Sequence, residues 1–250
     1  MFTNCGEIRM NKQAKFQLII SGVLFAFFIL LLILLLTVDV RPIAADGSNV
    51  GLASINKAIA DAIGFNGGWK KLTDVLMMMT MLEAVVFAGL GVFQGIKRKS
   101  LKEIDYTLIA LAITYLTMVF LYIFFELVVI NRRPILDEGK AEASFPSTHV
   151  LIILGIAGTG ITEINRLVKN KPIRICANIL TYAVMILAVV GRLLSGVHWF
   201  TDILAAILLS QAIVAAYNGV NVILTEKNKP ETKNETAPPE IPENADAVNE

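Results

Sequence analysis

Long apolar runs, separated by short polar segments, dominate this chain. A helix needs about 20 mainly apolar residues to cross the hydrocarbon core of a membrane. Six runs meet or approach that length: residues 18–38, 75–96, 106–130, 149–164, 175–190 and 203–224. The fourth and fifth runs are short, so each is expected to borrow a turn from its flanks. The pattern predicts an all-α fold, a bundle of six transmembrane helices within residues 16–224.

Three segments lie outside these runs. Residues 53–63 carry apolar side chains at helical spacing. This spacing predicts a helix in the membrane interface or, as the plainer alternative, an ordered loop that packs on the helix ends. Residues 225–250 are rich in Pro, Glu and Asn and lack apolar periodicity, which predicts a disordered acidic tail. Residues 1–15 form a short segment before the first run.

The basic residues predict an orientation. Short loops rich in Lys and Arg stay on the cytoplasmic side of a membrane. Such residues gather before the first run and after the second, fourth and sixth: Arg9, Lys12, Lys15; Lys97, Arg98, Lys99, Lys102; Arg166, Lys169, Lys171, Arg174; Lys227 and Lys229. With six spans all four groups share one side. We therefore expect a multi-pass protein of the cell membrane with both termini, residues 1–15 and 225–250, in the cytoplasm.

Composition supports the membrane assignment and limits the chemistry. Hydrophobic residues make up 55% of the chain and charged residues only 17%, against about 25% in soluble proteins. The net charge of +1 hides the acidic tail, because residues 226–250 hold three basic and seven acidic side chains. Two cysteines exclude a disulfide framework, and no CxxC or HExxH spacing offers a zinc site. We expect a membrane partner, no nucleic acid, no metal and no other cofactor.

Four cations fall in segments assigned to the extracytoplasmic side, where the orientation rule disfavours them: Arg132, Arg133, Lys140 and Arg192. A bound anion is the simplest physical reason for them, and the planar fork of Arg suits phosphate. Both histidines of the chain, His149 and His198, also lie in or beside these segments. The sequence therefore predicts a phosphate site at the outer end of the bundle.

The spacing of polar residues in these segments adds detail. Ser147 lies two residues before the fourth run, where a helix N-terminus would favour an anion. His198 and Asp202 are four residues apart, so on a helix they would share one face. The carboxylate could then hold one ring nitrogen and leave the other free, as an activated nucleophile requires.

Three segments resemble the signature motifs of the type 2 phosphatidic acid phosphatase superfamily, which read Lys-x6-Arg-Pro, Pro-Ser-Gly-His and Ser-Arg-x5-His-x3-Asp. The matching residues are Arg133 and Pro134, then Pro146, Ser147 and His149, then Arg192, His198 and Asp202. Three positions depart from the motifs: Glu126 stands at the usual Lys, Thr148 at the usual Gly and Gly191 at the usual Ser. Members that span the membrane have six helices, with the site facing away from the cytoplasm.

The resemblance implies a role for each matching residue. His198 would be the nucleophile and form a phosphohistidine, Asp202 would orient it, and His149 would protonate the leaving group. Arg133, Arg192 and Ser147 would hold the phosphate oxygens, with Thr148 beside them, and no metal is required. The substrate would be a lipid phosphate such as phosphatidic acid or phosphatidylglycerol phosphate, or an isoprenyl pyrophosphate of a bacterial envelope.

Several charged or aromatic residues have plainer interpretations. Glu126 is interpreted as pairing with Arg132 or Arg133 or as facing the protein interior, while Lys140 is a candidate to supply the missing cation. Arg132 is interpreted as reaching for lipid head groups, because Arg133 is the residue that aligns with the motif. Trp199 is interpreted as an interface anchor, with the wall of the site as the alternative. Glu83, inside the second run, is expected to be a buried group with hydrogen-bond partners.

Two other functions remain open. A transferase of the same fold would pass the phosphoryl or head group to an acceptor other than water, through the same histidine. A membrane interaction protein would keep the fold while Glu126, Thr148 and Gly191 weaken the site. A transporter is less favoured, because no pair of Gly- or Pro-broken spans is evident.

Overall fold

The computed structural model describes residues 11–99, 104–137 and 139–228. This part of the chain forms seven helices: α1 Lys12–Thr37, α2 Ala53–Ile63, α3 Gly67–Arg98, α4 Tyr106–Leu127, α5 Thr148–Leu167, α6 Lys171–Leu194 and α7 Phe200–Lys227. Its only sheet joins two short antiparallel strands, β1 Arg41–Pro42 and β2 Asn49–Val50. All the helices except α2 are long and apolar enough to cross a membrane. The predicted all-α bundle of six spans is therefore confirmed.

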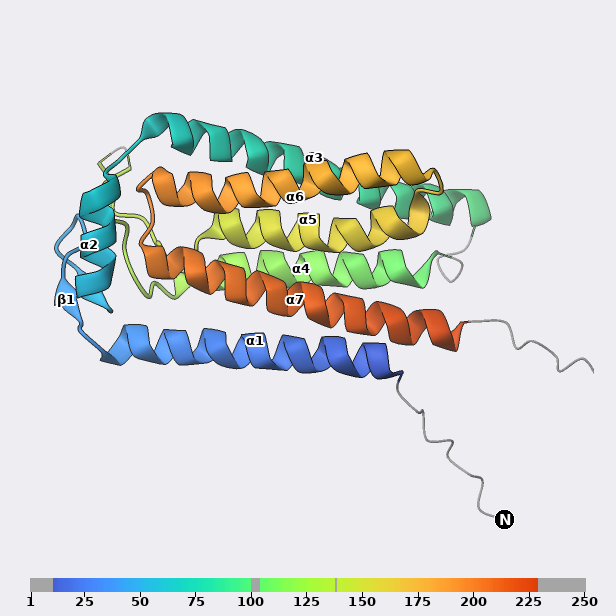
Figure 1. Ribbon diagram of the computed structural model, residues 1–250, viewed down its shortest axis with the longest axis horizontal. Helices are drawn as coiled ribbons and strands as arrows, with labels where there is room; N and C mark the ends of the chain where they lie inside the picture. Colours follow the sequence, from blue (N-terminus) through green and yellow to red (C-terminus); the bar gives the residue numbers. More distant parts are fainter. Residues whose placement is uncertain (1–10, 100–103, 138, 229–250) are drawn as a thin grey trace, which may run out of the picture.

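The six long helices run side by side, with the first turn of α1 and the last turn of α7 at one end of the bundle and α2 and β1 at the other (Figure 1). Helices α5 and α7 form the interior, since 67% and 56% of their most apolar windows are buried. The corresponding share of α6 is 6%, so most of its surface is left for lipid. Which end faces the cytoplasm stays a prediction.

The helices extend beyond the apolar runs, because polar residues form their first and last turns. Helix α3 begins at Gly67 rather than near residue 75, since the Asn66 side chain accepts hydrogen bonds from the amides of Gly68 and Trp69. Helix α6 continues to Leu194 and therefore includes Arg192. These extra turns bring side chains that were assigned to loops onto rigid helix ends.

Helix α2 was predicted as either a helix or an ordered loop, and it is a helix. It lies across the end of the bundle rather than along it (Figure 1). Asn56, which is fully buried, holds it there: its amide nitrogen donates to Gly51 O at 3.0 Å and to Thr201 Oγ1 at 2.9 Å. Because Thr201 is in the first turn of α7, this contact fixes α2 to the start of that helix.

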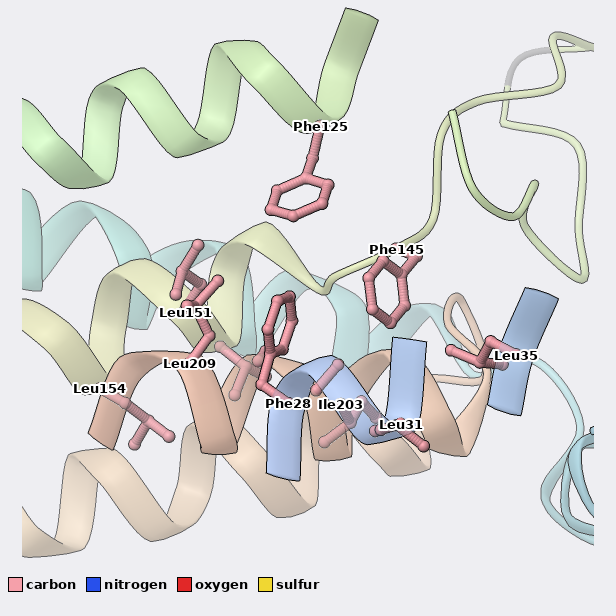
Figure 2. Close-up of a cluster of buried hydrophobic side chains, with 12 residues drawn as sticks. Phe28, Leu31, Leu35, Phe125, Phe145, Leu151, Leu154, Ile203 and Leu209 are labelled. Atoms are coloured by element: carbon pink, nitrogen blue, oxygen red, sulfur yellow. The ribbon is translucent and has the colours of Figure 1, made fainter. Parts of the chain in front are cut away.

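A cluster of aromatic rings joins the loop before α5 to the core. Phe145 is 1% exposed, and its ring lies 6.0 Å from that of Phe28 in α1 and 5.9 Å from that of Phe125 in α4 (Figure 2). Leu151 and Leu209 pack in the same cluster. Close packing leaves few alternative positions for a side chain of this size. The loop residues next to Phe145 are therefore held firmly.

Some predictions concern residues outside the described part of the chain. They include the disordered acidic tail beyond residue 228, most of the N-terminal segment, and the basic residues Arg9, Lys102 and Lys229.

Candidate active site

Polar residues from three separate segments meet at the end of the bundle that carries α2. They come from the loop between α4 and α5, from the last turn of α6, and from the turn that leads into α7. Four of them are almost completely buried: Ser147, Arg192, His198 and Asp202, with exposed fractions of 0%, 1%, 4% and 0%. Burial of this many polar groups is costly unless each finds a partner.

The turn between α6 and α7 places His198. Gly196, two residues earlier, has a φ of +66°, and a Cβ there would lie 2.1 Å from the carbonyl oxygen of Gly64. Only glycine meets both conditions without strain. The next turn residue toward α6, Ser195, accepts a hydrogen bond from the Asn66 amide at 3.0 Å. The turn is thus attached to the start of α3.

The environment of His198 keeps its ring neutral. Burial lowers the pKa of His198 well below its ordinary value, and the positive charges of Arg192 and Arg133 lower it further. A neutral imidazole carries one proton and one lone pair. The lone pair is what a nucleophile needs, so the pKa shift favours that role.

Asp202 does not touch His198 directly, contrary to the expectation from their spacing. Its Oδ2 lies 3.9 Å from His198 Nδ1, which is too long for a hydrogen bond. His198 is in the turn before α7, so the two residues do not share a helix face. Ser144 lies between them: its hydroxyl donates to Asp202 Oδ2 at 2.6 Å and is 3.2 Å from His198 Nδ1. Its carbonyl oxygen is 3.0 Å from the same nitrogen.

His149 and Arg192 share one carboxylate that the sequence did not single out. Asp74 Oδ1 lies 2.9 Å from His149 Nε2 and 3.3 Å from Arg192 Nη1. Asp74 is in the first turns of α3, which were assigned to a loop. An Asp at the position i+4 from Lys70, near a helix start, was the only signal available, and it is a weak one.

Arg133 and Arg192 approach the site from different elements. Arg192 also donates to Thr73 Oγ1 at 3.1 Å, while Arg133 Nη1 lies 2.8 Å from Glu142 and 3.4 Å from Asp137. Both cations face carboxylates in this structure. An incoming phosphate would compete for groups that already bind oxygen anions.

Four buried polar atoms at this site have no hydrogen-bond partner among the described residues: Ser147 Oγ, His149 Nδ1, Arg192 Nε and His198 Nε2. Each belongs to a different position of the second and third motif segments. Buried polar atoms are rarely left unpaired, so such a group calls for an explanation. Ser147 is also the N-cap residue of α5, where backbone amides favour an anion.

A cavity of about 860 Å³ opens beside His149, between α3, α4 and the loop before α5. Its polar part includes Arg133, Glu142, Thr148 and His149. Its apolar part includes Met77, Met81, Val119 and Ile152, so one cavity offers both charged and hydrocarbon surfaces. That combination suits an amphipathic molecule.

Comparison with known proteins decides the family. The model of the PAP2 superfamily matches residues 83–222, which is more than half of the chain. The chain belongs to the PAP2 superfamily. The resemblance drawn from the three motif segments is thereby confirmed.

A solved structure supports the same fold. The chain is similar to a transmembrane PAP2-type phosphatidylglycerolphosphate phosphatase from Bacillus subtilis, with 19% identity and a TM-score of 0.52. The match covers 84% of this chain and 97% of that one. At this identity the similarity establishes the fold alone. No match was found among curated proteins.

The structure gives a reason for one departure from the PAP2 motifs and a location for another. A Cβ on Gly191 would lie 2.9 Å from Thr73 Cγ2 and 3.3 Å from the Trp69 ring. The start of α3 therefore occupies the space that a serine side chain would need. Thr148, at the usual Gly, is partly buried and lines the cavity.

Lys140 and Glu126 differ from their interpretations. Lys140 is exposed, lies outside the cavity lining, and is bonded through its backbone to Asp137. Glu126 lines the cavity and is exposed, but it makes no ion pair with Arg132 or Arg133 among the described residues. The structure therefore does not bring Lys140 to the site, and Glu126 stays unpaired there.

Three further interpretations were wrong. Arg132 donates to Ala141 O at 2.6 Å and pairs with Asp46 at 3.3 Å, instead of extending freely toward head groups. Trp199 is 2% exposed and donates to the carbonyl oxygen of Arg132 at 2.7 Å, so it is a buried cap of α7 rather than an interface anchor. Glu83 has a buried Oε1 without a partner among the described residues, instead of a satisfied hydrogen bond.

Proposed function

We propose that this protein is a membrane phosphatase that removes a phosphoryl group from a lipid phosphate or an isoprenyl pyrophosphate, through a phosphohistidine at His198. One observation carries the proposal. Ser147 Oγ, Arg192 Nε and His198 Nε2 come from two motif segments, are buried, and have no partner among the described residues. Two donors and one nucleophilic lone pair in one place suit a phosphoryl group better than any neutral ligand.

The proposed reaction has two steps. In the first, the His198 Nε2 lone pair forms a bond to phosphorus while the bond to the leaving oxygen breaks. His149 gives its proton to that oxygen, and Arg133 and Arg192 hold the phosphate oxygens. In the second, water attacks phosphorus, His149 accepts a proton from the water, and the N–P bond breaks to release phosphate.

The amphipathic cavity supports a lipid substrate. A phosphate bound near His149 would leave the hydrocarbon part of the molecule beside Met77, Met81 and Val119. The solved structure with a similar fold is a phosphatidylglycerolphosphate phosphatase, which makes this lipid one substrate to test. We place the site on the extracytoplasmic face, because the basic loops lie at the opposite end of the bundle (Figure 1).

A phosphate-release assay on purified protein tests the proposal. The panel contains phosphatidic acid, phosphatidylglycerol phosphate and an isoprenyl pyrophosphate, and the control is His198→Ala. We expect release from at least one lipid by the wild type and a loss of about 10⁴-fold in the variant. EDTA is expected to leave the rate unchanged. Equal release by the two proteins would refute the proposal.

The same-fold transferase is separated by its products. A second lipid with a free hydroxyl is added, and a transferase would convert it to a phosphorylated product at the expense of inorganic phosphate. A protein that only binds partners would release phosphate from no lipid in the panel.

A further inference from the structure

Ser144 lies directly before Phe145, outside the three motif segments, and is 1% exposed. Every polar group it has is in use. Its amide donates to Asn131 O at 2.9 Å, and its hydroxyl donates to Asp202 Oδ2 at 2.6 Å. Its carbonyl oxygen is 3.0 Å from His198 Nδ1, and its hydroxyl oxygen is 3.2 Å from the same nitrogen. Two of these four contacts involve the hydroxyl, which can donate one hydrogen bond and accept another at the same time.

These contacts fix where the proton of His198 lies. A carbonyl oxygen can only accept, so a hydrogen bond to Ser144 O requires the proton on Nδ1. The Ser144 hydroxyl has one proton, which it gives to Asp202, so its oxygen faces Nδ1 with a lone pair. Both contacts on this side of the ring therefore accept from Nδ1–H. The lone pair of His198 is left on Nε2, the atom without a partner among the described residues.

Asp202 is itself held in place. Its Oδ2 accepts from the Trp199 amide at 3.0 Å, and its Oδ1 accepts from Asn131 Nδ2 at 3.2 Å. The carboxylate is thus fixed 3.9 Å from His198 Nδ1. Within the described part of the chain, only the Ser144 hydroxyl bonds to Asp202 while also contacting the ring.

We propose that Ser144 is a positioning residue that couples Asp202 to the nucleophile of the phosphatase reaction. Its carbonyl keeps the proton on Nδ1, and its hydroxyl, polarised by the carboxylate, stabilises the positive charge that the ring gains. This inference rests on the proposed role of His198.

The charge on the ring changes once in each half of the reaction. When Nε2 bonds to phosphorus, the leaving oxygen departs with the P–O electron pair and takes a proton from His149. The imidazole keeps its Nδ1 proton and becomes a cation. When water later displaces Nε2, the electron pair returns to the ring. The Nδ1 proton stays in place throughout, so Ser144 acts through charge and orientation rather than by proton transfer.

Kinetics of Ser144→Ala test the coupling. We expect kcat to fall about 10- to 100-fold, as is usual when an outer partner of a working histidine is removed, with KM unchanged. Ser210→Ala is the matched control, because Ser210 is equally buried but bonds only to Ile207 O of its own helix. It should leave kcat and KM at their wild-type values.

A double-mutant cycle with Asp202→Asn separates coupling from a general structural effect. If Ser144 acts through Asp202, Ser144→Ala costs less than about threefold in kcat in the Asp202→Asn background. Equal losses in both backgrounds, or a wild-type kcat in Ser144→Ala, would overturn the proposal. Wild-type activity that is lost in His198→Ala upholds the proposed function in either case.

A second measurement does not need activity. The chain has only two histidines, so His198 is the single imidazole in His149→Gln. Nitrogen-15 resonances of that full-length variant in detergent should show the proton on Nδ1, with the Nδ1 proton signal far downfield. Adding Ser144→Ala should move this signal upfield, whereas adding Ser210→Ala should not. A proton on Nε2, or an Nδ1 proton signal that Ser144→Ala does not shift, would refute the proposal even if no substrate is known.

Discussion

The buried charges at the two ends of the bundle differ in their partners. At the end where α1 begins and α7 ends, Glu163 is fully buried and accepts from Tyr217, Asn221 and twice from Arg166, at 2.6 to 3.3 Å. Arg166 also pairs with Asp105. In the candidate site, at the end that carries α2, four buried polar atoms lack partners among the described residues.

The difference separates a structural cluster from a reactive one. A fully bonded network ties helices together and has nothing left to offer a ligand. Glu163 is about 20 Å along α5 from the site, so the two clusters do not share contacts. Unpaired buried atoms, in contrast, cost free energy that a bound phosphate would recover. Substitutions at the two ends should therefore affect different measurements.

After His198→Ala, the largest effect is expected from Arg192→Ala at the reactive end. It removes a guanidinium that is aimed at the place where charge develops, so kcat/KM should fall about 10²- to 10³-fold. Arg192→Lys, which keeps the charge but loses the fork, should recover only part of the loss. Arg132→Ala is the control at the same end of the bundle, and it should cost less than about fivefold because its ion pair with Asp46 is partly exposed. The release assay measures all three variants, and equal losses in Arg132→Ala and Arg192→Ala would contradict the assignment.

Glu163→Gln should destabilise the opposite end of the bundle without changing the catalytic reaction. Removing the charge weakens its hydrogen bonds, so the free energy of unfolding should fall by about 1–3 kcal/mol. Thermal unfolding in detergent measures the change, and the specific activity of the folded protein should stay the same. Asp61→Asn is the control, because Asp61 is an exposed partner of Lys57 and should leave the unfolding temperature unchanged. A loss of activity at an unchanged unfolding temperature would show that Glu163 takes part in the reaction.

Asp74→Asn has a smaller effect of two parts. The carboxylate holds His149 Nε2 at 2.9 Å and favours the protonated form of that ring, so losing its charge should lower kcat about tenfold by reducing the fraction of His149 that carries the proton to be donated. The same carboxylate competes with phosphate for Arg192, so inhibition by inorganic phosphate should become stronger. Steady-state kinetics at several phosphate concentrations measure both parts. Weaker inhibition in the variant would mean that Asp74 and phosphate do not compete.

Asp74 also shows which part of the site could not be predicted from the sequence. Apolar runs reveal which segments cross the membrane, and motif spacing reveals His149, Arg192 and His198, because both signals are local. Neither signal identifies Asp74 or Ser144, because each acts through a contact with a residue that is far away in the chain. Asp202 was found, but its partner was misassigned, because the spacing rule holds only if His198 is helical. These contacts depend on where each helix begins and ends. A count of apolar residues does not detect the polar first and last turns of a helix.

The smallest effect is expected from Glu126→Lys, which would restore the usual residue of the first motif. Glu126 lines the cavity near Arg133 and makes no ion pair among the described residues, so no network is lost when its charge is reversed. A lysine there would add attraction for the substrate phosphate, and turnover should stay the same or rise by up to about threefold. Glu126→Gln, which removes the charge without adding another, should give an intermediate value. Parallel release assays on the three proteins measure the trend. A complete loss of activity in Glu126→Lys would mean that the carboxylate has a role of its own. Glu126 would then take part in the reaction rather than only line the cavity.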